Sequence, residues 1–162
     1  MSDKKKLIIP TFAVLALVTG FILYSPSNLL PRTMKTATIS NIGLHLAEDA
    51  QTIFLISILM NNPSSVPVTI TDVDITMLVN GSNYNSMTIG SVDITIPPGQ
   101  EQSITTMVQL IGSPIGYQPS ETQQHYELEI TATITGETKS LGMEASRTTT
   151  ITDTRSWWYS IS

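Results

Sequence analysis

The stretch Tyr126–Ile134 reads Tyr-Glu-Leu-Glu-Ile-Thr-Ala-Thr-Ile, and its side chains alternate between two kinds with a period of two residues. One set of alternate positions is apolar or aromatic, and the other set holds only Glu and Thr. Successive side chains of a β-strand point to opposite faces of a sheet, so this alternation indicates a strand with one face in a core and the other in solvent. The β-branched residues of the stretch also favour such a half-buried surface.

The same alternation recurs in both directions from this stretch, and turn residues separate the segments. Residues 66–79 alternate too, but a slip of one position at Thr71-Asp72 predicts a β-bulge. Asn80-Gly81 predicts a type I′ hairpin turn, and Gly136–Lys139 predicts a second hairpin turn. The expected strands are 36–46, 51–60, 66–79, 86–96, 102–110, 124–135 and 139–152. Seven short strands in roughly 120 residues are typical of a β-sandwich, so the sequence predicts an all-β fold.

One expected strand, Ile53–Met60, is apolar on both faces. In a two-layer sandwich one face of each strand normally meets solvent. Its outer face is therefore expected either to be covered, by the 112–123 connection, the tail or another protein, or simply to expose a few aliphatic side chains. Phe54, Ile56 and Ile58 are accordingly candidate interaction residues.

The N-terminus combines Lys4-Lys5-Lys6 with an uncharged apolar run from Leu7 to Tyr24. As a helix this run reaches roughly 27 Å, which is close to the thickness of a bilayer core. The positive-inside rule puts the lysines in the cytoplasm and the rest of the chain outside. A cleaved signal peptide is the alternative, but the run exceeds the usual length of about 7–15 residues and Pro26 spoils the nearest cleavage site. The expectation is a retained, single-pass helix in the cell membrane, with lipid as its partner.

The sequence thus predicts a cytoplasmic N-terminus (1–6), a transmembrane helix (7–24), a linker (25–35), a β-sandwich domain (36–152) and an aromatic tail (153–162). The linker is expected because Ser25–Pro31 is loop-like, with two prolines, two serines and an asparagine. Since the strands supply their own core, residues 33–162 alone are expected to fold and stay soluble.

Composition excludes several classes of function. The chain has no cysteine, so disulfides, thiolate nucleophiles and cysteine-ligated metals are ruled out. Thirteen acidic residues outnumber eight basic ones, for a net charge of −5, and three of the eight are the N-terminal lysines. The remainder is strongly acidic and repels phosphate backbones, so a nucleic-acid partner is not expected.

No catalytic constellation is found in the sequence. His45 and His125 lie on different expected strands, and neither belongs to a metal-ligand motif. Asp72 and Asp74 share the solvent face of a strand and are read as solubilising, since no oxygen-rich calcium loop accompanies them. There is no phosphate-binding loop. The expectation is a protein that is not an enzyme and that has no metal and no cofactor.

Two further sites are candidates outside the core. Asn80-Gly81-Ser82 is a glycosylation sequon at an expected hairpin tip, although Asn-Gly also suffices to make the turn. Trp157, Trp158 and Tyr159 hold both tryptophans of the chain close to its end. Three environments suit these aromatics: the bilayer interface, a partner protein, or the outer face of the doubly apolar strand. We expect the tail to be ordered and to contact one of them.

An ordered set of motifs spans Ile39 to Leu110, which is under half of the chain. These are an apolar strand running into Asn61-Asn62-Pro63, the strand Val66–Ile70 with its continuation to Asn80-Gly81, a strand carrying Gly90, and Ile96-Pro97-Pro98-Gly99 leading into Ile104–Leu110. In this order and spacing they resemble the late embryogenesis abundant (LEA) proteins of the second subgroup, whose core is the water-stress and hypersensitive-response (WHy) domain. The resemblance does not extend to the Trp-rich tail. Relatives carry a short helix near residues 112–124, whereas Pro114, Gly116 and Pro119 make a long helix implausible here.

The resemblance implies a sandwich similar to fibronectin type III and immunoglobulin domains, and a non-enzymatic role in desiccation or other stress tolerance. It also implies a membrane-anchored layout like that of archaeal and bacterial members. The leading expectation is therefore an anchored extracytoplasmic sandwich that binds or stabilises surfaces. The alternative is a structural or accessory subunit of a larger membrane complex or archaeal-type surface filament.

Overall fold

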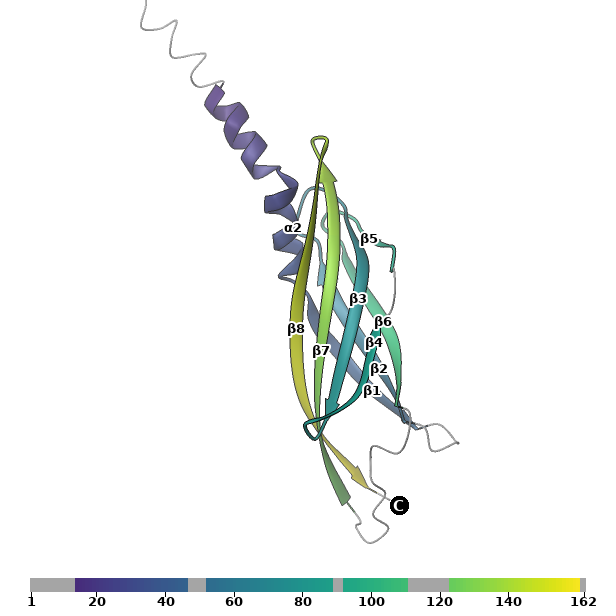
Figure 1. The fold of residues 1–162 in the computed structure, drawn as a ribbon. Coiled ribbons are helices and arrows are strands. Elements are labelled where there is room, and N and C mark those ends of the chain that lie inside the picture. Colours follow the sequence, from purple (N-terminus) through teal and green to yellow (C-terminus); the bar gives the residue numbers. More distant parts are fainter. Residues whose placement is uncertain (1–13, 47–51, 89–91, 111–122, 161–162) are drawn as a thin grey trace, which may run out of the picture.

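Two antiparallel β-sheets lie face to face along the long axis of the molecule, and an apolar helix leads into one end (Figure 1). The computed structural model describes residues 14–46, 52–88, 92–110 and 123–160. A three-stranded sheet has the order β1-β2-β6, formed by Thr38–Leu46, Thr52–Asn61 and Glu101–Leu110. The larger sheet has the order β4-β3-β7-β8, with β5 also paired to β3. Its strands are β3 (Val68–Val79), β4 (Ser82–Thr88), β5 (Ile94–Ile96), β7 (Gln123–Ser140) and β8 (Met143–Ser160). The expectation of a mostly β fold in two antiparallel layers is confirmed.

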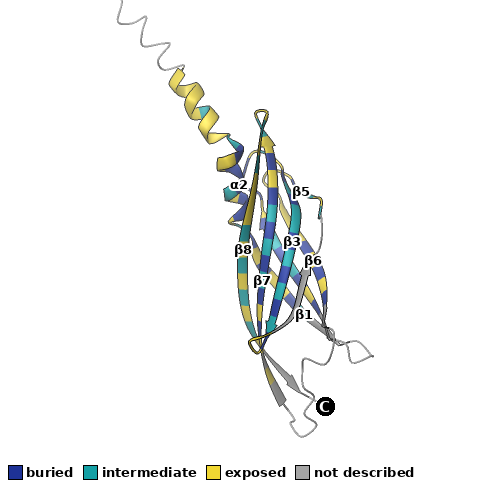
Figure 2. Cartoon of the chain, in the orientation of Figure 1, coloured by how far each residue is buried: buried dark blue, intermediate teal, exposed yellow. Residues whose placement is uncertain are grey.

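The core lies between the two sheets and is built from the alternate positions that the sequence marks as apolar. Burial therefore runs in stripes along the strands (Figure 2). The larger sheet contributes Val68, Ile70, Val73, Ile75, Met77, Val79, Leu128, Ile130, Ala132 and Ile134. The smaller sheet contributes Ile39, Ile42, Phe54, Ile56, Ile58, Met60, Ile104 and Val108. Full burial of one such aliphatic side chain contributes about 1.5–3 kcal/mol, so this pattern is what holds the sheets together.

Two local expectations in β3 are confirmed. The pairing of β3 with β7 shifts register between Ile70 and Asp72, which is the predicted bulge. Asn80 and Gly81 have φ angles of 50° and 76°, as the type I′ turn between β3 and β4 requires. The expected strand 86–96 is in fact two strands, β4 and β5, which both pair with β3 on either side of its bulge.

The predicted hairpin turn at Gly136–Lys139 is wrong. β7 continues through this segment to Ser140, and the turn is made by Leu141 and Gly142, with φ angles of 53° and 75°. Gly136 is needed for close approach instead of for a turn, because a Cβ atom built on it would lie 2.8 Å from the Sδ atom of Met34. β8 likewise runs far beyond the expected end at residue 152, since β7 begins early enough to pair with it as far as Ser160.

We expect Gly136→Ala to destabilise the fold by about 1–3 kcal/mol, because the added methyl group displaces Met34 from a full site. Chemical denaturation of the variant measures this cost. Met34→Ala makes room for the methyl group. The destabilisation of the double variant should therefore be smaller than the sum of the destabilisations of the two single variants. Strict additivity would show that the two side chains do not share the site.

The expected linker 25–35 is also wrong, because its central part is the helix α2, Pro26–Met34. Pro26 occupies the first turn, where a missing N–H costs little. The helix buries Leu30 and Met34 in the core cluster, and its Leu29 is buried as well. Leu30 and Met34 are each only 1% exposed. A helix of nine residues with an internal Pro31 has little stability of its own. Its stability comes from this packing, which a loop-like sequence does not reveal.

Residues 14–23 form a second helix that is exposed along its length and joins α2 through a short bend at Tyr24 and Ser25. The side-chain amide of Asn28 donates to the carbonyl of Ile22 at 2.6 Å, and the N–H of Leu29 donates to the carbonyl of Ser25 at 3.1 Å. Together these helices, Val14–Met34, are long and apolar enough to cross a membrane. No flexible segment separates the apolar helix from the sandwich.

Candidate interaction surfaces

The predicted interaction residues on β2 face the core. Phe54 is 2% exposed, and Ile56 and Ile58 are fully buried, so the expectation that they form an interaction surface is wrong. The reason is that β2 is the central strand of its sheet, and these residues are the half of its alternation that faces the other sheet. A strand that is apolar on both faces does not indicate which half points inward.

The outer face of the same sheet carries a small apolar patch. Leu55 is 39% exposed and lies directly opposite Met107 on β6, which is 56% exposed. Two residues along the strands, the hydroxyls of Ser57 and Thr105 lie 3.0 Å apart. We call Leu55 and Met107 the outer patch. Leu55 belongs to the other set of alternate apolar positions in Ile53–Met60, the set that does not contain Phe54, Ile56 and Ile58. The sequence therefore did carry a signal for an apolar residue on this outer face.

The Trp-rich tail belongs to β8, where Trp157, Trp158 and Tyr159 pair in backbone register with the start of β7. The backbone of the tail as far as Ser160 is therefore strand, and the environment of the three side chains stays a prediction. This end of β8 lies at the opposite end of the sandwich from the apolar helix (Figure 1).

Asn80 is exposed at the tip of the β3–β4 hairpin, as expected. Its N–H donates to the carbonyl of Glu127 at 2.8 Å, and its side-chain oxygen accepts the N–H of Glu127 at 2.9 Å. Asn80 thus holds the hairpin against β7 as well as making the turn. Its glycosylation stays a prediction.

A buried polar cluster that the sequence reasoning missed closes the end of the sandwich next to the apolar helix. Its centre is Asn62, which follows β2 and is fully buried. The side-chain oxygen of Asn62 accepts the hydroxyls of Thr33 from α2, at 2.8 Å, and of Ser64, at 2.6 Å. The side-chain amide donates to the carbonyls of Val66 and Ile96 at 2.8 and 2.9 Å. The cluster therefore ties α2, the β2–β3 connection and β5 together.

The backbone of Asn62 extends this cluster: its N–H donates to the carbonyl of Gln100, and its carbonyl accepts the N–H of Gly99. Within the part of the chain that the structure describes, no buried side-chain nitrogen or oxygen lacks a partner. The only signal in the sequence was the Asn61-Asn62-Pro63 motif. The side-chain oxygen and amide of Asn62 both have hydrogen-bond partners, so the role of the cluster that the geometry supports is structural.

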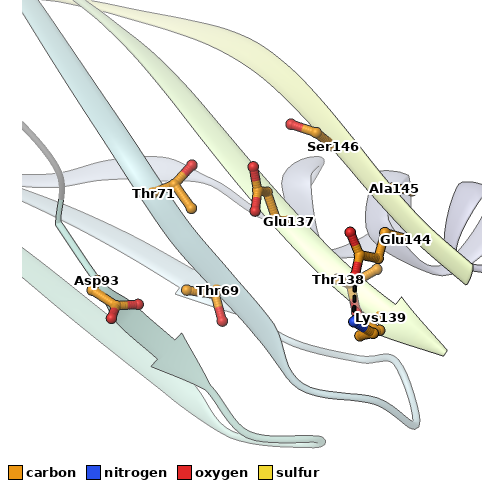
Figure 3. Close-up of a pocket in the computed structure, with 9 residues that line it drawn as sticks. All are labelled: Thr69, Thr71, Asp93, Glu137, Thr138, Lys139, Glu144, Ala145 and Ser146. Atoms are coloured by element: carbon orange, nitrogen blue, oxygen red, sulfur yellow. Dashed lines mark hydrogen bonds and ion pairs between the residues drawn. The ribbon is translucent and has the colours of Figure 1, made fainter. Parts of the chain in front are cut away.

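A shallow pocket of about 440 Å³ lies on the outer face of the larger sheet, near the β7–β8 hairpin (Figure 3). Its lining residues are Thr69, Thr71, Asp93, Glu137, Thr138, Lys139, Glu144, Ala145 and Ser146. Figure 3 shows Asp93 apart from Glu137 and Glu144, so the three carboxylates do not converge. Among the described residues no group of three or more His, Cys, Asp or Glu residues is placed to hold a metal ion.

The one cation of the pocket, Lys139, is engaged with Glu144. The hydrogen bond between these side chains, together with their charge attraction, raises the pKa of Lys139 and lowers the pKa of Glu144. Both side chains are 70% exposed, so solvent screens the pair and it contributes little to stability. The pocket combines hydroxyls and carboxylates without a nucleophile paired to a base, which suits polar contacts and not covalent chemistry.

The fold and these surfaces define a class of protein: two antiparallel sheets packed on one core, entered through an apolar N-terminal helix. A crystal structure of a protein from Archaeoglobus fulgidus is similar, with 12% identity and a TM-score of 0.50 over 76% of this chain and 99% of that chain. The solution structure of AT1g01470 from Arabidopsis thaliana gives 11% identity and a TM-score of 0.48, over 77% and 80% of the two chains. No family model and no curated protein matches the sequence. The first likeness supports the two-sheet fold alone.

Proposed function

We propose that this chain is a non-catalytic, membrane-anchored protein whose sandwich, of the fibronectin type III or immunoglobulin kind, stands on the extracytoplasmic side and binds or stabilises surfaces there. The observation that carries the proposal is that the exposed apolar helix continues directly into α2, and that Leu30 and Met34 of α2 are part of the core. A helix with Leu17 74% exposed needs an apolar surrounding, and a bilayer supplies it. The orientation follows from Lys4-Lys5-Lys6 at the cytoplasmic end.

The anchor would hold the sandwich in a fixed relation to the membrane, because the bend at Ser25 is bridged by hydrogen bonds. β8 has 18 residues, and a strand of that length rises about 55–60 Å. Its Trp-rich end is therefore about that far from the anchor end. Of the three environments for the tail, this arrangement favours a partner protein or the sandwich itself over the anchoring bilayer.

The outer face of the larger sheet suits contact with hydrated surfaces. Threonine hydroxyls of β7 and β8 lie in facing pairs 3.0–3.4 Å apart, at Thr131 with Thr152, Thr133 with Thr150 and Thr135 with Thr148. A hydroxyl both donates and accepts, so such rows can take over hydrogen bonds that water otherwise makes. This face supports the stress-related role that the LEA and WHy resemblance implies.

Fractionation tests the anchorage. We expect the full chain to remain with membranes after alkaline carbonate washing, and residues 25–162 to be released in folded form. External protease should digest the sandwich of right-side-out cells while it spares residues 1–6. Release of the full chain by carbonate, or protection of the sandwich from protease, would contradict the proposal.

Drying tests the stabilising role. Vesicles that carry the full chain and a trapped dye should leak less after drying and rehydration than vesicles that carry residues 1–24 alone. Equal leakage from both would remove the stress-related part of the proposal and leave the anchorage standing.

The outer patch favours a second candidate function, an accessory subunit of a larger membrane complex. Exposed Leu55 and Met107 lie side by side on the smaller sheet, and docking would cover them. Solubilisation in mild detergent followed by mass analysis separates a monomer from a complex. If the patch docks, the variant with Leu55→Ser and Met107→Ser should lose the partner and stay folded.

A further inference from the structure

The turn residue Leu141 has an unusual conformation for its type. Its φ of 53° lies in the left-handed region, which non-glycine residues other than Asn and Asp seldom adopt. The side chain is 60% exposed, so packing within the sandwich does not compensate for the conformation. The β3–β4 hairpin makes the same turn with Asn80 and Gly81, at φ angles of 50° and 76°. Of these two hairpins, only β7–β8 places a large apolar side chain at this position.

The two hairpins point to opposite ends of the sandwich. The β7–β8 tip lies at the end where the apolar helix enters, and α2 packs against both strands of this hairpin, whereas the β3–β4 tip lies at the far end (Figure 1). A strained, exposed leucine therefore occurs at the end that faces the bilayer if the helix spans it. Local strain of this kind is often retained where the side chain has a function.

Basic residues gather at the same end. The chain has five Lys or Arg residues after Lys6, and four of them, Arg32, Lys35, Lys139 and Arg147, lie on α2, at its C-cap or on the β7–β8 hairpin. All four are exposed. The hairpin also carries Glu137 and Glu144, and Asp93 and Glu101 lie at the same end. α2 and its C-cap, by contrast, carry Arg32 and Lys35 without any carboxylate. An anionic headgroup layer attracts such residues when they lie close to it.

We propose that the β7–β8 tip is a second membrane contact, in which Leu141 enters the headgroup and acyl boundary of the bilayer that holds the anchor helix. Arg32 and Lys35 then face the lipid phosphates. This inference rests on the proposed function, since it needs the helix to span. One leucine binds a bilayer weakly by itself, but the anchor makes its insertion an intramolecular step at high effective concentration. The contact would fix the tilt of the sandwich on the membrane.

The chain has no cysteine, so one introduced cysteine can carry a polarity-sensitive dye at a single position. The full chain is placed in phosphatidylcholine and phosphatidylglycerol vesicles, with and without nitroxide-labelled lipid. Leu141→Cys and Ser140→Cys report on the tip, and Asn80→Cys is the control at the opposite hairpin. Leu17→Cys reports on the anchor helix, and circular dichroism checks that each variant is folded.

We expect the dye at position 141 or 140 to shift to shorter wavelength and to be quenched several-fold more by the nitroxide lipid than the dye at position 80. Quenching at position 17 with none at 140 and 141 would overturn this inference alone. No quenching at position 17 would overturn the proposed anchorage as well. A dye at 141 that is shielded from water but not quenched by lipid would mean that a protein covers the tip, and would also overturn the inference.

Discussion

A chain that begins at Ser25 should fold as a soluble sandwich, whereas a chain that begins at Thr36 should aggregate or melt without cooperativity. This result is expected because α2 supplies core side chains that are almost fully buried: Leu29 is 3% exposed, and Leu30 and Met34 are each 1% exposed. Truncation of one buried Leu or Met to Ala costs about 2–5 kcal/mol. The loss of all three side chains is therefore comparable with the 5–15 kcal/mol that stabilises a typical domain. The sequence-based expectation that residues 33–162 suffice is revised accordingly.

Circular dichroism and thermal melting of residues 25–162 and 36–162 provide the measurement. Point variants separate packing from the mere presence of the helix. Leu30→Ala should lower the free energy of unfolding by about 2–5 kcal/mol, and Arg32→Ala, at an exposed position of the same helix, by less than about 0.5 kcal/mol. If residues 36–162 melt at the same temperature as residues 25–162, α2 is dispensable and this account of the core is wrong.

Asn62→Ala is the second change with a large expected effect, a loss of roughly 3–5 kcal/mol of stability. The substitution removes the side-chain oxygen, which accepts hydrogen bonds, and the side-chain amide N–H groups, which donate them. Thr33 and Ser64 lose the oxygen they donate to, and the carbonyls of Val66 and Ile96 lose the amide that reaches them. Buried polar groups without partners are costly, and here they lie where α2 meets the sheets.

Urea unfolding of residues 25–162 measures this loss, with Asn61→Ala as the matched control. Asn61 precedes Asn62 and is exposed, so its truncation should change the free energy of unfolding by less than about 0.5 kcal/mol. Asn62→Asp should be no better than Asn62→Ala at neutral pH, because a carboxylate cannot donate to two carbonyls and its charge is buried. Equal unfolding midpoints for Asn62→Ala and the unchanged domain would show that the cluster does not stabilise the fold.

For the membrane hypothesis, the position of α2 matters more than the apolar helix alone. A flexible linker would have left the sandwich free to tumble above the bilayer, and no part of it would then have faced the lipid persistently. Because α2 both continues the apolar helix and is part of the core, one end of the domain would face the membrane if that helix spans it. The Asn62 cluster and the Leu141 tip both lie at that end.

The sequence by itself determined the features that depend on neighbouring residues. Alternation with a period of two specifies a strand wherever it occurs, so β3 and β7, with the bulge after Ile70, could be predicted. The turn at Asn80 and Gly81 is likewise a local property, because only a few residue types accept its backbone angles. The apolar run at the N-terminus could also be recognised from the sequence, because the mean hydropathy of a segment depends only on its own residues.

The tertiary structure alone decided the features that depend on contacts between distant residues. α2 contains prolines and is stable only because its apolar side meets both sheets, so its sequence resembled a loop. Gly136 resembled a turn residue, but its small size serves the approach of Met34, about a hundred residues earlier in the chain. The direction in which Phe54 and Leu55 point was undecided, because both are apolar and only the second sheet distinguishes inside from outside. Each of these outcomes is set by burial, and burial is defined only once the whole chain has folded.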